Sequence, residues 1–271
     1  MTTIADGSRD SRAAVEKAVS LLACFEEGAA TALGVSELAR RAELSKSTTH
    51  RVLAMLERNG VIERIGTGYR LGTKLYSPGR SAYAPGQEDV RDALIPFVTD
   101  LYTATRETVH LAALHGTDVV YLAKLYGHRH LPSPSRIGGT MPAHCTAVGK
   151  VLLAYHPESA QEVLAGPLRR YTDHTIADAS VLEAELRRIR HAGLAAEHGE
   201  VQCGLSCFAV PVMGQNGRPV AALSVSGPTG RLDSRHHSHT LRMVASAASK
   251  ALQSRRRSLP GVPHPKHAIA S

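Results

Sequence analysis

The chain has 271 residues, of which 43% are apolar and 21% are charged, values that are ordinary for a folded protein of one large or two modest domains. It contains no apolar run of the roughly 18 residues needed to cross a bilayer, and its opening lacks the basic start and apolar stretch of a signal peptide. Its four cysteines are too few and too scattered for a disulfide framework. We therefore expect a cytoplasmic protein, neither secreted nor in contact with a membrane.

The net charge of +8 is unevenly distributed along the chain. Residues 1–80 carry a net charge of +3, residues 81–249 are neutral, and residues 250–271 carry +5. A basic segment beside a neutral body is typical of a polyanion-binding module attached to a second domain.

The first part of the chain has the pattern of short helices. Residues 1–11 are expected to be a disordered start, and the apolar spacing that follows predicts a helix over residues 11–26, which Gly28 ends. A second, short helix is expected over residues 36–41, with Ser36 as its N-cap.

A third helix and a hairpin complete this part. After a three-residue turn at 42–44, Ser45 is expected to cap a helix of about 14 residues that Asn59 and Gly60 end. Two short strands, over residues 61–65 and 69–71, flank a Gly-rich turn and predict a hairpin. Three helices with this turn, followed by a hairpin, predict a winged helix-turn-helix.

The start of the third helix is rich in small hydroxyls and basic side chains. This composition suits the major groove of DNA, where hydroxyls and helix amides bind phosphates and basic side chains bind guanine edges. Two arginines of the hairpin are placed to reach the flanking backbone or the minor groove. The DNA contacts that we expect are Ser36, Ser45, Lys46, Ser47, Thr48, Thr49, His50, Arg51, Arg64 and Arg70. For the helix taken alone, the alternative is a solvated polar face in an ordinary three-helix cluster.

The second part of the chain mixes strands and helices. A Pro- and Gly-containing stretch at 78–87 marks the expected domain boundary, and a helix over 89–104 follows, in which Pro96 implies a kink or a later start. The elements expected after it are strands at 108–114, 119–125, 207–213 and 220–226 and helices at 145–155, 158–165, 180–192 and 233–253. This mixed order predicts an α+β fold rather than a doubly wound sheet. The chain is accordingly divided into a start (1–11), a DNA-binding domain (12–76), a linker with a connecting helix (77–104), a second domain (105–253) and a basic, Pro-containing tail (254–271).

A small group of polar side chains in the second domain predicts a pocket. Cys207, Ser224 and Ser226 lie on neighbouring predicted strands, and the two serines share one face of the sheet because they are two residues apart. Such hydroxyls among Val and Leu predict the polar floor of an apolar pocket, and the helix start at 146–149 offers amides to a carboxylate or phosphate. The alternative is a core in which the cysteine is inert and the backbone satisfies both serines.

Ordered motifs run through both parts of the chain. The first part contains VEKAV (15–19), SELAR (36–40), KSTTHR (46–51), LERNG (56–60) and GYRLG (68–72). The second part contains PAHCTAVGK (142–150) followed by LLA (152–154), the spaced pattern of Glu200, Gly204, Cys207, Ala209, Pro211 and Val212, and ALSVSGP (222–228). Together, over residues 13–250, these motifs resemble the IclR family of bacterial transcriptional regulators.

The resemblance implies a ligand-responsive regulator with no enzymatic activity and no cofactor, whose GAF-like second domain binds a small organic molecule, often an acid. The effector contacts that it implies are Ala147, Val148, Glu197, Cys207, Ser224 and Ser226, with Leu205 and Val212 in the apolar wall. Glu197 is longer than the aspartate that can appear at its position, and its carboxylate would repel an acidic ligand unless one of the two is protonated or bridged.

The partners expected are a double-stranded DNA operator, a small-molecule effector for which an organic acid is one candidate, and further copies of the chain as a homodimer or a dimer of dimers. The helix over 89–104 is expected to connect the domains and to support dimerisation. The family contains repressors and activators, and a repressor is slightly favoured.

Two other classes remain open. In one, the second domain only oligomerises; in the other, Cys207 with His144 or His198 forms the nucleophile pair of an enzyme that carries a DNA-binding domain. A zinc site at Cys203 and Cys207 is not expected, because their spacing matches no ordinary finger. The His-rich segment 236–239 is expected to be a solvated turn.

Overall fold

The computed structural model describes residues 12–25, 32–75, 87–128, 131–232 and 234–255. The chain forms two compact units, residues 1–83 and 84–271, each of which is described by itself. The expected start at 1–11, the stop at Gly28 and most of the expected boundary and tail lie outside the described residues.

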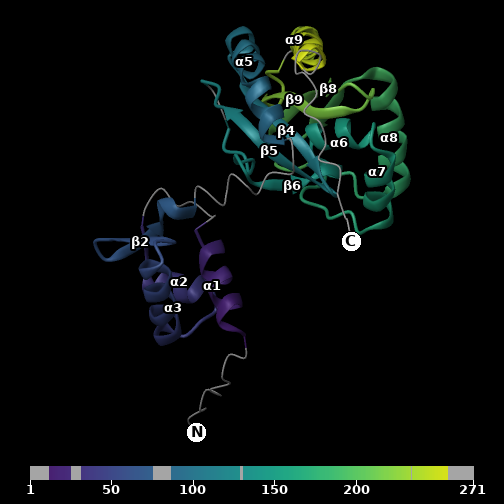
Figure 1. Cartoon of the computed structure of the whole chain (residues 1–271). Helices are drawn as coiled ribbons and strands as arrows, with labels where there is room; N and C mark the ends of the chain where they lie inside the picture. The colour runs from purple at the N-terminus through teal and green to yellow at the C-terminus, as the bar shows by residue number, and fades with distance from the viewer. Residues whose placement is uncertain (1–11, 26–31, 76–86, 129–130, 233, 256–271) are drawn as a thin grey trace, which may run out of the picture. The chain divides into compact units, whose positions relative to one another are not determined.

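The first unit consists of helices followed by a hairpin (Figure 1). Its elements are α1 (Ala14–Ala23), β1 (Leu33–Gly34), α2 (Val35–Arg41), α3 (Lys46–Arg58), β2 (Ile62–Ile65), β3 (Gly68–Leu71) and a 3₁₀ turn (Thr73–Leu75). Each helix contributes one fully buried leucine to the core, Leu21, Leu38 and Leu53, and the hairpin adds Ile62 and Tyr69. The winged helix-turn-helix predicted from the sequence is confirmed.

The ends of α3 follow from local chemistry, as predicted. The hydroxyl of Ser45 accepts a hydrogen bond from the amide of Thr48 at 3.2 Å and so caps the first turn. Asn59 caps the other end, and Gly60 follows with a positive φ of 70° that suits glycine.

Strand β1 has no counterpart in the sequence prediction. Leu33 pairs with Tyr69 and Gly34 with Gly68, so the hairpin becomes a three-stranded sheet in the order β1-β3-β2. The predicted cap at Ser36 is wrong, because Gly34 at the end of β1 is the extended residue before α2 and Ser36 lies inside that helix. A Cβ at Gly68 would lie 2.8 Å from the Cβ of Ala32, so β1 approaches β3 too closely for a side chain there.

The second unit is built on a six-stranded antiparallel sheet with the order β6-β5-β4-β9-β8-β7. Its strands are β4 (Thr108–His115), β5 (Asp118–Leu125), β6 (Thr140–Pro142), β7 (Ala195–His198), β8 (Leu205–Met213) and β9 (Pro219–Pro228). Its helices are α5 (Gln87–Thr105), α6 (Ala147–Leu153), α7 (Pro157–Ala165), α8 (Ala179–Ala192) and α9 (Ser234–Arg255), with a 3₁₀ turn at Ala143–Cys145.

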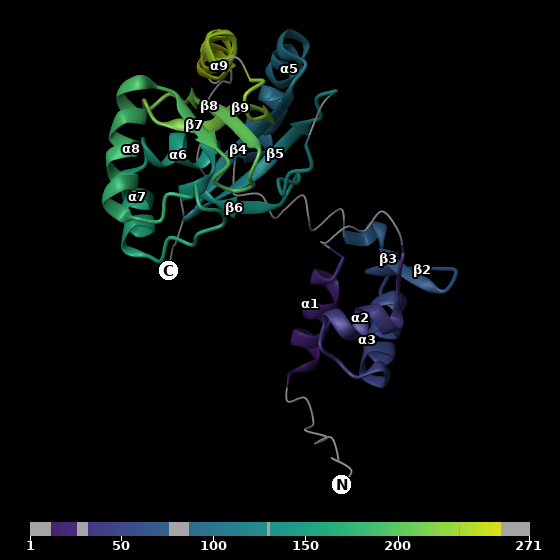
Figure 2. The same cartoon turned by 180° about the vertical axis from the view of Figure 1, so that it is seen from behind.

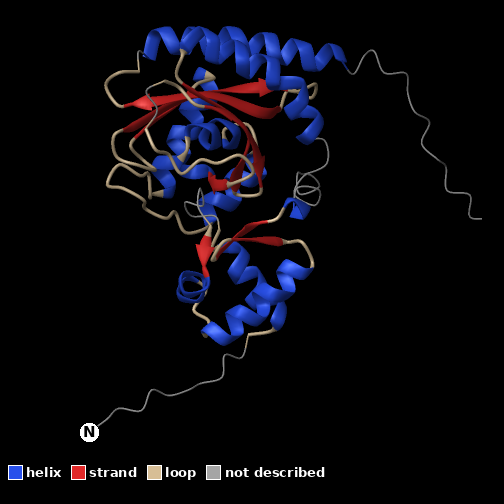
Figure 3. Ribbon diagram, turned by 90° about the vertical axis from the view of Figure 1, so that its left-hand side faces the viewer, coloured by secondary structure: helices blue, strands red, loops and turns tan. Residues whose placement is uncertain are grey.

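Helices cover both faces of this sheet. Helices α5 and α9 lie on one face, and α6, α7 and α8 lie on the other (Figures 1 and 2). Figure 3 shows α9 running along the sheet. Every residue of α6 is buried, from Ala147 to Leu153, because this short helix lies between the sheet and α8. The predicted α+β fold is confirmed.

The second unit differs from the sequence prediction in detail. Helix α5 runs unbroken from Gln87, so the later start allowed for Pro96 is wrong; Pro96 lies in its interior. The segment 236–239 belongs to α9 rather than to a turn, and His237 is buried. The short strands β6 and β7 were not predicted, because three or four residues carry too little periodicity. None of the described helices is long and apolar enough to cross a membrane.

Candidate functional site

The exposed face of α3 is positively charged. Lys46, His50 and Arg51 are exposed, and the side chains of Lys46 and Arg51 form no ion pair with any residue that the structure describes. Ser47 is exposed beside them, within 3.1 Å of the Ser45 hydroxyl. The unpaired amides and positive dipole of the helix start add to these charges. The face is therefore suited to bind phosphate.

Two of the predicted contacts on this helix point elsewhere. Thr49 is fully buried, and its hydroxyl has no hydrogen-bond partner among the described residues. Its side chain therefore cannot reach DNA, and the prediction for Thr49 is wrong: position 49 faces the core because it is three residues before Val52 and four before Leu53. Thr48 is half-buried, and its hydroxyl accepts a hydrogen bond from Ser45 at 2.9 Å.

Of the two arginines of the hairpin, one is paired and one has no ion pair with a residue that the structure describes. Arg64 is exposed and forms no ion pair with a described residue. Arg70 lies opposite Glu63 in the hairpin and pairs with its carboxylate at 2.8 Å, which lowers the pKa of Glu63. Both partners are partly exposed, so this pair contributes little to stability and can open.

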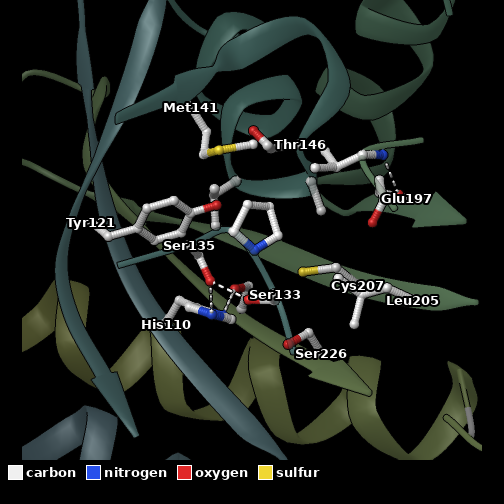
Figure 4. Close-up of a pocket in the computed structure, with 15 residues that line it drawn as sticks. His110, Tyr121, Ser133, Ser135, Met141, Thr146, Glu197, Leu205, Cys207 and Ser226 are labelled. Carbon is white, nitrogen blue, oxygen red and sulfur yellow. Dashed lines mark hydrogen bonds between the residues drawn. The ribbon is translucent and has the colours of Figure 1, made fainter. Parts of the chain in front are cut away.

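A cavity of about 40 Å³ lies in the second unit between the sheet and the start of α6 (Figure 4). All six residues for which effector contacts were expected line it: Ala147, Val148, Glu197, Cys207, Ser224 and Ser226. Leu205 lines it as well, whereas Val212 is fully buried elsewhere and does not. The volume holds a few water molecules, far below the roughly 300 Å³ of a small-molecule pocket. An organic ligand therefore requires the walls to move.

Strand register explains why distant residues meet on the cavity floor. Glu197 of β7 lies opposite Cys207 of β8, which lies opposite Ser226 of β9. Two residues along β9 from Ser226, Ser224 lies opposite His110 of β4. Residues opposite each other across strands share a face, so these rows form one polar surface.

The start of α6 is held close to the floor. Thr146 caps the helix by accepting a hydrogen bond from the amide of Gly149 at 3.1 Å. A Cβ at Gly149 would lie 2.2 Å from the carbonyl oxygen of Ala143, so only glycine permits this approach.

Glu197 is a buried carboxyl with an unusual pKa. Its Oε1 accepts hydrogen bonds from the amides of Glu200 and Val201. Burial outweighs these bonds, with a smaller contribution from the charge of Glu200, and raises the pKa of Glu197 to about 7. Near neutral pH the Glu197 carboxyl is therefore divided between its two protonation states. The protonated form does not repel an acidic ligand, which reduces the conflict expected from the sequence.

Behind Glu197 lies a buried ion pair between Lys150 of α6 and Glu200. Lys150 also donates to the carbonyl oxygen of Ala196 at 2.9 Å, and the amide of Ile176 donates to Glu200 at 3.4 Å. These contacts fix the segment that carries Glu197 against α6. They give a structural reason for Lys150, which ends the motif at 142–150, and for Glu200, which begins the spaced motif that ends at Val212.

Cys207 is not arranged as a nucleophile. Burial, followed by the charge of Glu197, raises the pKa of its thiol to about 12, so the thiol stays protonated. His144 hydrogen-bonds to the carbonyl oxygen of Arg169, and His198 to the hydroxyl of Ser206, at 3.0 and 3.1 Å. Neither histidine is therefore paired with Cys207. Across the residues that the structure describes, no cluster of three or more His, Cys, Asp and Glu side chains is suited to hold a metal ion.

Several lining residues were missed from the sequence. They are His110, Tyr121, Ser133, Pro134, Ser135, Met141 and Val201. His110 had a detectable signal, since its ring can donate or accept a hydrogen bond and it stands between the apolar residues Val109 and Leu111 of β4. The loop residues Ser133 and Ser135 had none, because a loop carries no periodicity from which to assign a face.

Comparison with known proteins gives consistent matches for both units. The IclR helix-turn-helix domain matches residues 14–66, and the bacterial transcriptional regulator IclR C-terminal domain matches residues 84–252. The chain is 36% identical over 223 residues to the HTH-type transcriptional regulator XynR of Escherichia coli (strain K12), covering 81% of this chain and 87% of XynR. It is 35% identical over 247 residues to the HTH-type transcriptional regulator KdgR of Dickeya chrysanthemi, covering 90% of this chain and 80% of KdgR.

Solved structures agree with these matches. An IclR homologue from Microbacterium hydrocarbonoxydans complexed with 4-hydroxybenzoate has a TM-score of 0.74 and 30% identity, covering 91% of this chain and all of that chain. The IclR of Thermotoga maritima has a TM-score of 0.72 and 30% identity, covering 88% of this chain and 98% of that chain.

Proposed function

The chain belongs to the IclR family of bacterial transcriptional regulators, and from that premise we propose that it is a repressor whose operator binding is relieved by a small organic acid. The first unit binds operator DNA through α3 and the hairpin. The second unit binds the acid in the cavity between its sheet and α6. The observation that carries the proposal is the gathering of all six expected effector contacts around that one cavity.

The exposed cations of the first unit support the DNA contact. Lys46, Arg51 and Arg64 have no ion pair among the described residues, so their charges are free for phosphates or guanine edges. Ser36 is exposed on α2, and Ser47 and His50 are exposed on α3. Thr49 is excluded from this set by its burial.

The nature of the effector is supported by the lining and by one relative. Hydroxyls, a thiol, the His110 ring and a carboxyl that is half protonated near pH 7 line the cavity together with apolar side chains. The Microbacterium homologue is described in complex with 4-hydroxybenzoate, a small aromatic acid. The cavity of this chain measures about 40 Å³, so an acid of this class enters it only in a conformation in which the walls lie farther apart.

Because the cavity must widen to admit the acid, the acid can shift the protein between two conformations that differ in DNA binding. A ligand shifts an equilibrium between two conformations only by the difference in its affinity for them. The acid stabilises the wide form of the second unit, and the DNA-bound protein uses the narrow form. A shift from 1:99 to 99:1 requires a difference of about 5.5 kcal/mol.

The protein acts as a homodimer or a dimer of dimers in this proposal. Two winged helices related by a two-fold axis bind a near-palindromic operator with half-sites about one helical turn or a multiple of it apart. A second unit that only oligomerises is the competing function, and it predicts no response to any small molecule.

The test is a gel shift with the purified full chain on the DNA upstream of its own gene, with excess competitor DNA. We expect a discrete band that resists competitor, weakens steeply with salt because phosphate contacts release counterions, and is lost on adding one member of a metabolite panel that includes 4-hydroxybenzoate and uncharged sugars. Binding that ignores the whole panel contradicts effector control, and smearing that competitor removes contradicts a specific operator there.

We also propose that Cys207 has no catalytic role. Its protonated thiol and the separate partners of His144 and His198 support this. Cys207→Ser should leave operator binding intact, and turnover of any effector that disappears in this variant would contradict the proposal.

A further inference from the structure

A buried lysine lies next to the cavity floor. Lys124 of β5 is directly opposite His110 of β4, and His110 is opposite Ser224 of β9, so the three side chains continue one row across the sheet. Lys124 is 8% exposed. Its ammonium donates to Ser133 Oγ at 3.1 Å, to Ser135 Oγ at 3.0 Å and to the carbonyl oxygen of Ser135 at 2.8 Å.

All of these acceptors are uncharged. No carboxylate of a described residue lies within ion-pair distance of Lys124. Arg136, which acts on it electrostatically, is also positive, and burial followed by the charge of Lys124 lowers the pKa of His110 to about 3, so that ring is neutral. The pKa of Lys124 falls to about 8 through burial and Arg136, yet the group remains mostly charged at neutral pH. The ammonium also lies 4.6 Å from the centroid of the Tyr126 ring, which is uncharged too. A buried cation without a counter-ion is costly, and an anion that reaches it relieves that cost.

The segment that covers this cation also narrows the cavity. We call residues 133–135 the strap. The Ser135 hydroxyl lies 3.0 Å from His110 Nε2 and 2.6 Å from the Ser133 hydroxyl, and all three strap residues line the cavity. The chain returns to the sheet just beyond, where the amide of Gly138 donates to the carbonyl oxygen of Tyr121 at 2.8 Å. The strap hydroxyls therefore stand between the Lys124 ammonium and the cavity.

The two ends of the cavity differ in charge. Figure 4 shows Glu197 on one side and His110, Ser133 and Ser135 on the other. An acid group next to Glu197 meets a second carboxyl, whereas an acid group at the strap end meets the Lys124 ammonium once the serines move aside. The electrostatics therefore favour one orientation of an acidic ligand.

We propose that Lys124 binds the acid group of the effector: a monocarboxylate displaces the strap from the Lys124 ammonium, takes the place of the serine oxygens, and directs its uncharged part toward Cys207 and Glu197. The exchange replaces uncharged acceptors with an anion at a buried cation, which makes a stronger hydrogen bond and an ion pair. The inference rests on the proposed function and adds to it the charge of the ligand and its orientation.

The test is thermal unfolding of the full chain at pH 7, followed by far-UV circular dichroism because the protein has no Trp. The probes are formate, acetate and benzoate, compared at equal ionic strength with formamide, acetamide and benzamide. The proteins are the wild type, Lys124→Met, and Lys250→Met as a control that removes an exposed lysine of α9. We expect at least one carboxylate to raise the wild-type Tm by about 3 °C or more, its amide to have no effect, and the gain to vanish only in Lys124→Met.

Each contrary result has a distinct meaning. An equal gain in Lys124→Met overturns the role of Lys124 and leaves effector control standing. No gain with any carboxylate in the wild type also overturns it, and the gel shift with uncharged metabolites then decides the proposed function separately. If Lys124→Met does not fold, Ser135→Ala is used. It removes one of the three acceptors of the ammonium, the Ser135 hydroxyl, which an entering carboxylate would otherwise have to displace. The carboxylate gain should therefore increase, and an unchanged or smaller gain overturns the proposal.

Discussion

Replacement of Glu197 by glutamine tests the electrostatics of the cavity. Burial raises the pKa of Glu197 from 4.5 to about 7, and each pH unit between the two values corresponds to about 1.4 kcal/mol. In this window the folded state holds the proton more tightly than the unfolded state, so the free energy of unfolding falls as the pH rises. The side chain is only 3% exposed, so the fall is expected to reach about 3 kcal/mol above pH 7. Glu197→Gln has no such proton and should not show this fall.

The assay is urea unfolding of both proteins between pH 4.5 and 8.5, followed by far-UV circular dichroism. The difference in unfolding free energy, variant minus wild type, should increase by about 3 kcal/mol across this range. His110 contributes in the opposite sense, since its lowered pKa removes stability as the pH falls below 6.5, but it does so in both proteins. A difference that is constant with pH would refute the reasoning, because it would mean that the amides of Glu200 and Val201 compensate fully for burial.

Three further predictions concern other parts of the chain. Arg51→Ala should weaken operator binding about 5- to 100-fold in a gel shift without lowering the Tm. Arg58→Ala, at the far end of α3, is the control and should weaken operator binding less. Equal losses of affinity in the two variants would contradict a special role for Arg51. Thr49→Val removes a buried hydroxyl without a partner among the described residues, so unfolding should show about 1 kcal/mol of added stability, and any loss of operator affinity would restore Thr49 as a contact. Lys150→Met should destabilise the second unit by about 3–5 kcal/mol in urea, because it leaves Glu200 buried without its cation; a neutral result would mean that Glu200 takes up a proton.

The elements that were predictable share a strong local signal. The amphipathic helices, the capping serine at position 45 and the glycine turn of the β2–β3 hairpin each follow from a few neighbouring residues. Strand β1 and the shifted start of α2 do not, because two residues adopt an extended form only through pairing with β3. Thr49 was misassigned for a related reason: a hydroxyl in a polar run was read from its neighbours, whereas helix geometry turns it to the core.

The cavity shows the same division between local and long-range information. Ser224 and Ser226 were placed on one face by their spacing alone, and the family resemblance supplied Glu197 and the residues of α6. Lys124 and His110 could be paired only with the register of β4 against β5, and the strap only with the path of a loop. A residue 25 positions away from its partner, as Ser135 is from His110, leaves no trace in a sequence pattern.

The pairing of β1 with β3 also has a consequence for how binding specificity can change. Because Leu33 and Gly34 are hydrogen-bonded to the hairpin and lead straight into α2, the hairpin and the helix pair cannot be adjusted separately. In the proposed complex with DNA, the distance between the bases contacted by α3 and the phosphates contacted by Arg64 is therefore set by the backbone. In that proposed complex, new side chains on α3 would change which bases are preferred, while the length of each half-site would stay the same. Gly68 helps to maintain this arrangement, because a larger residue there would displace Ala32, the residue that leads into β1.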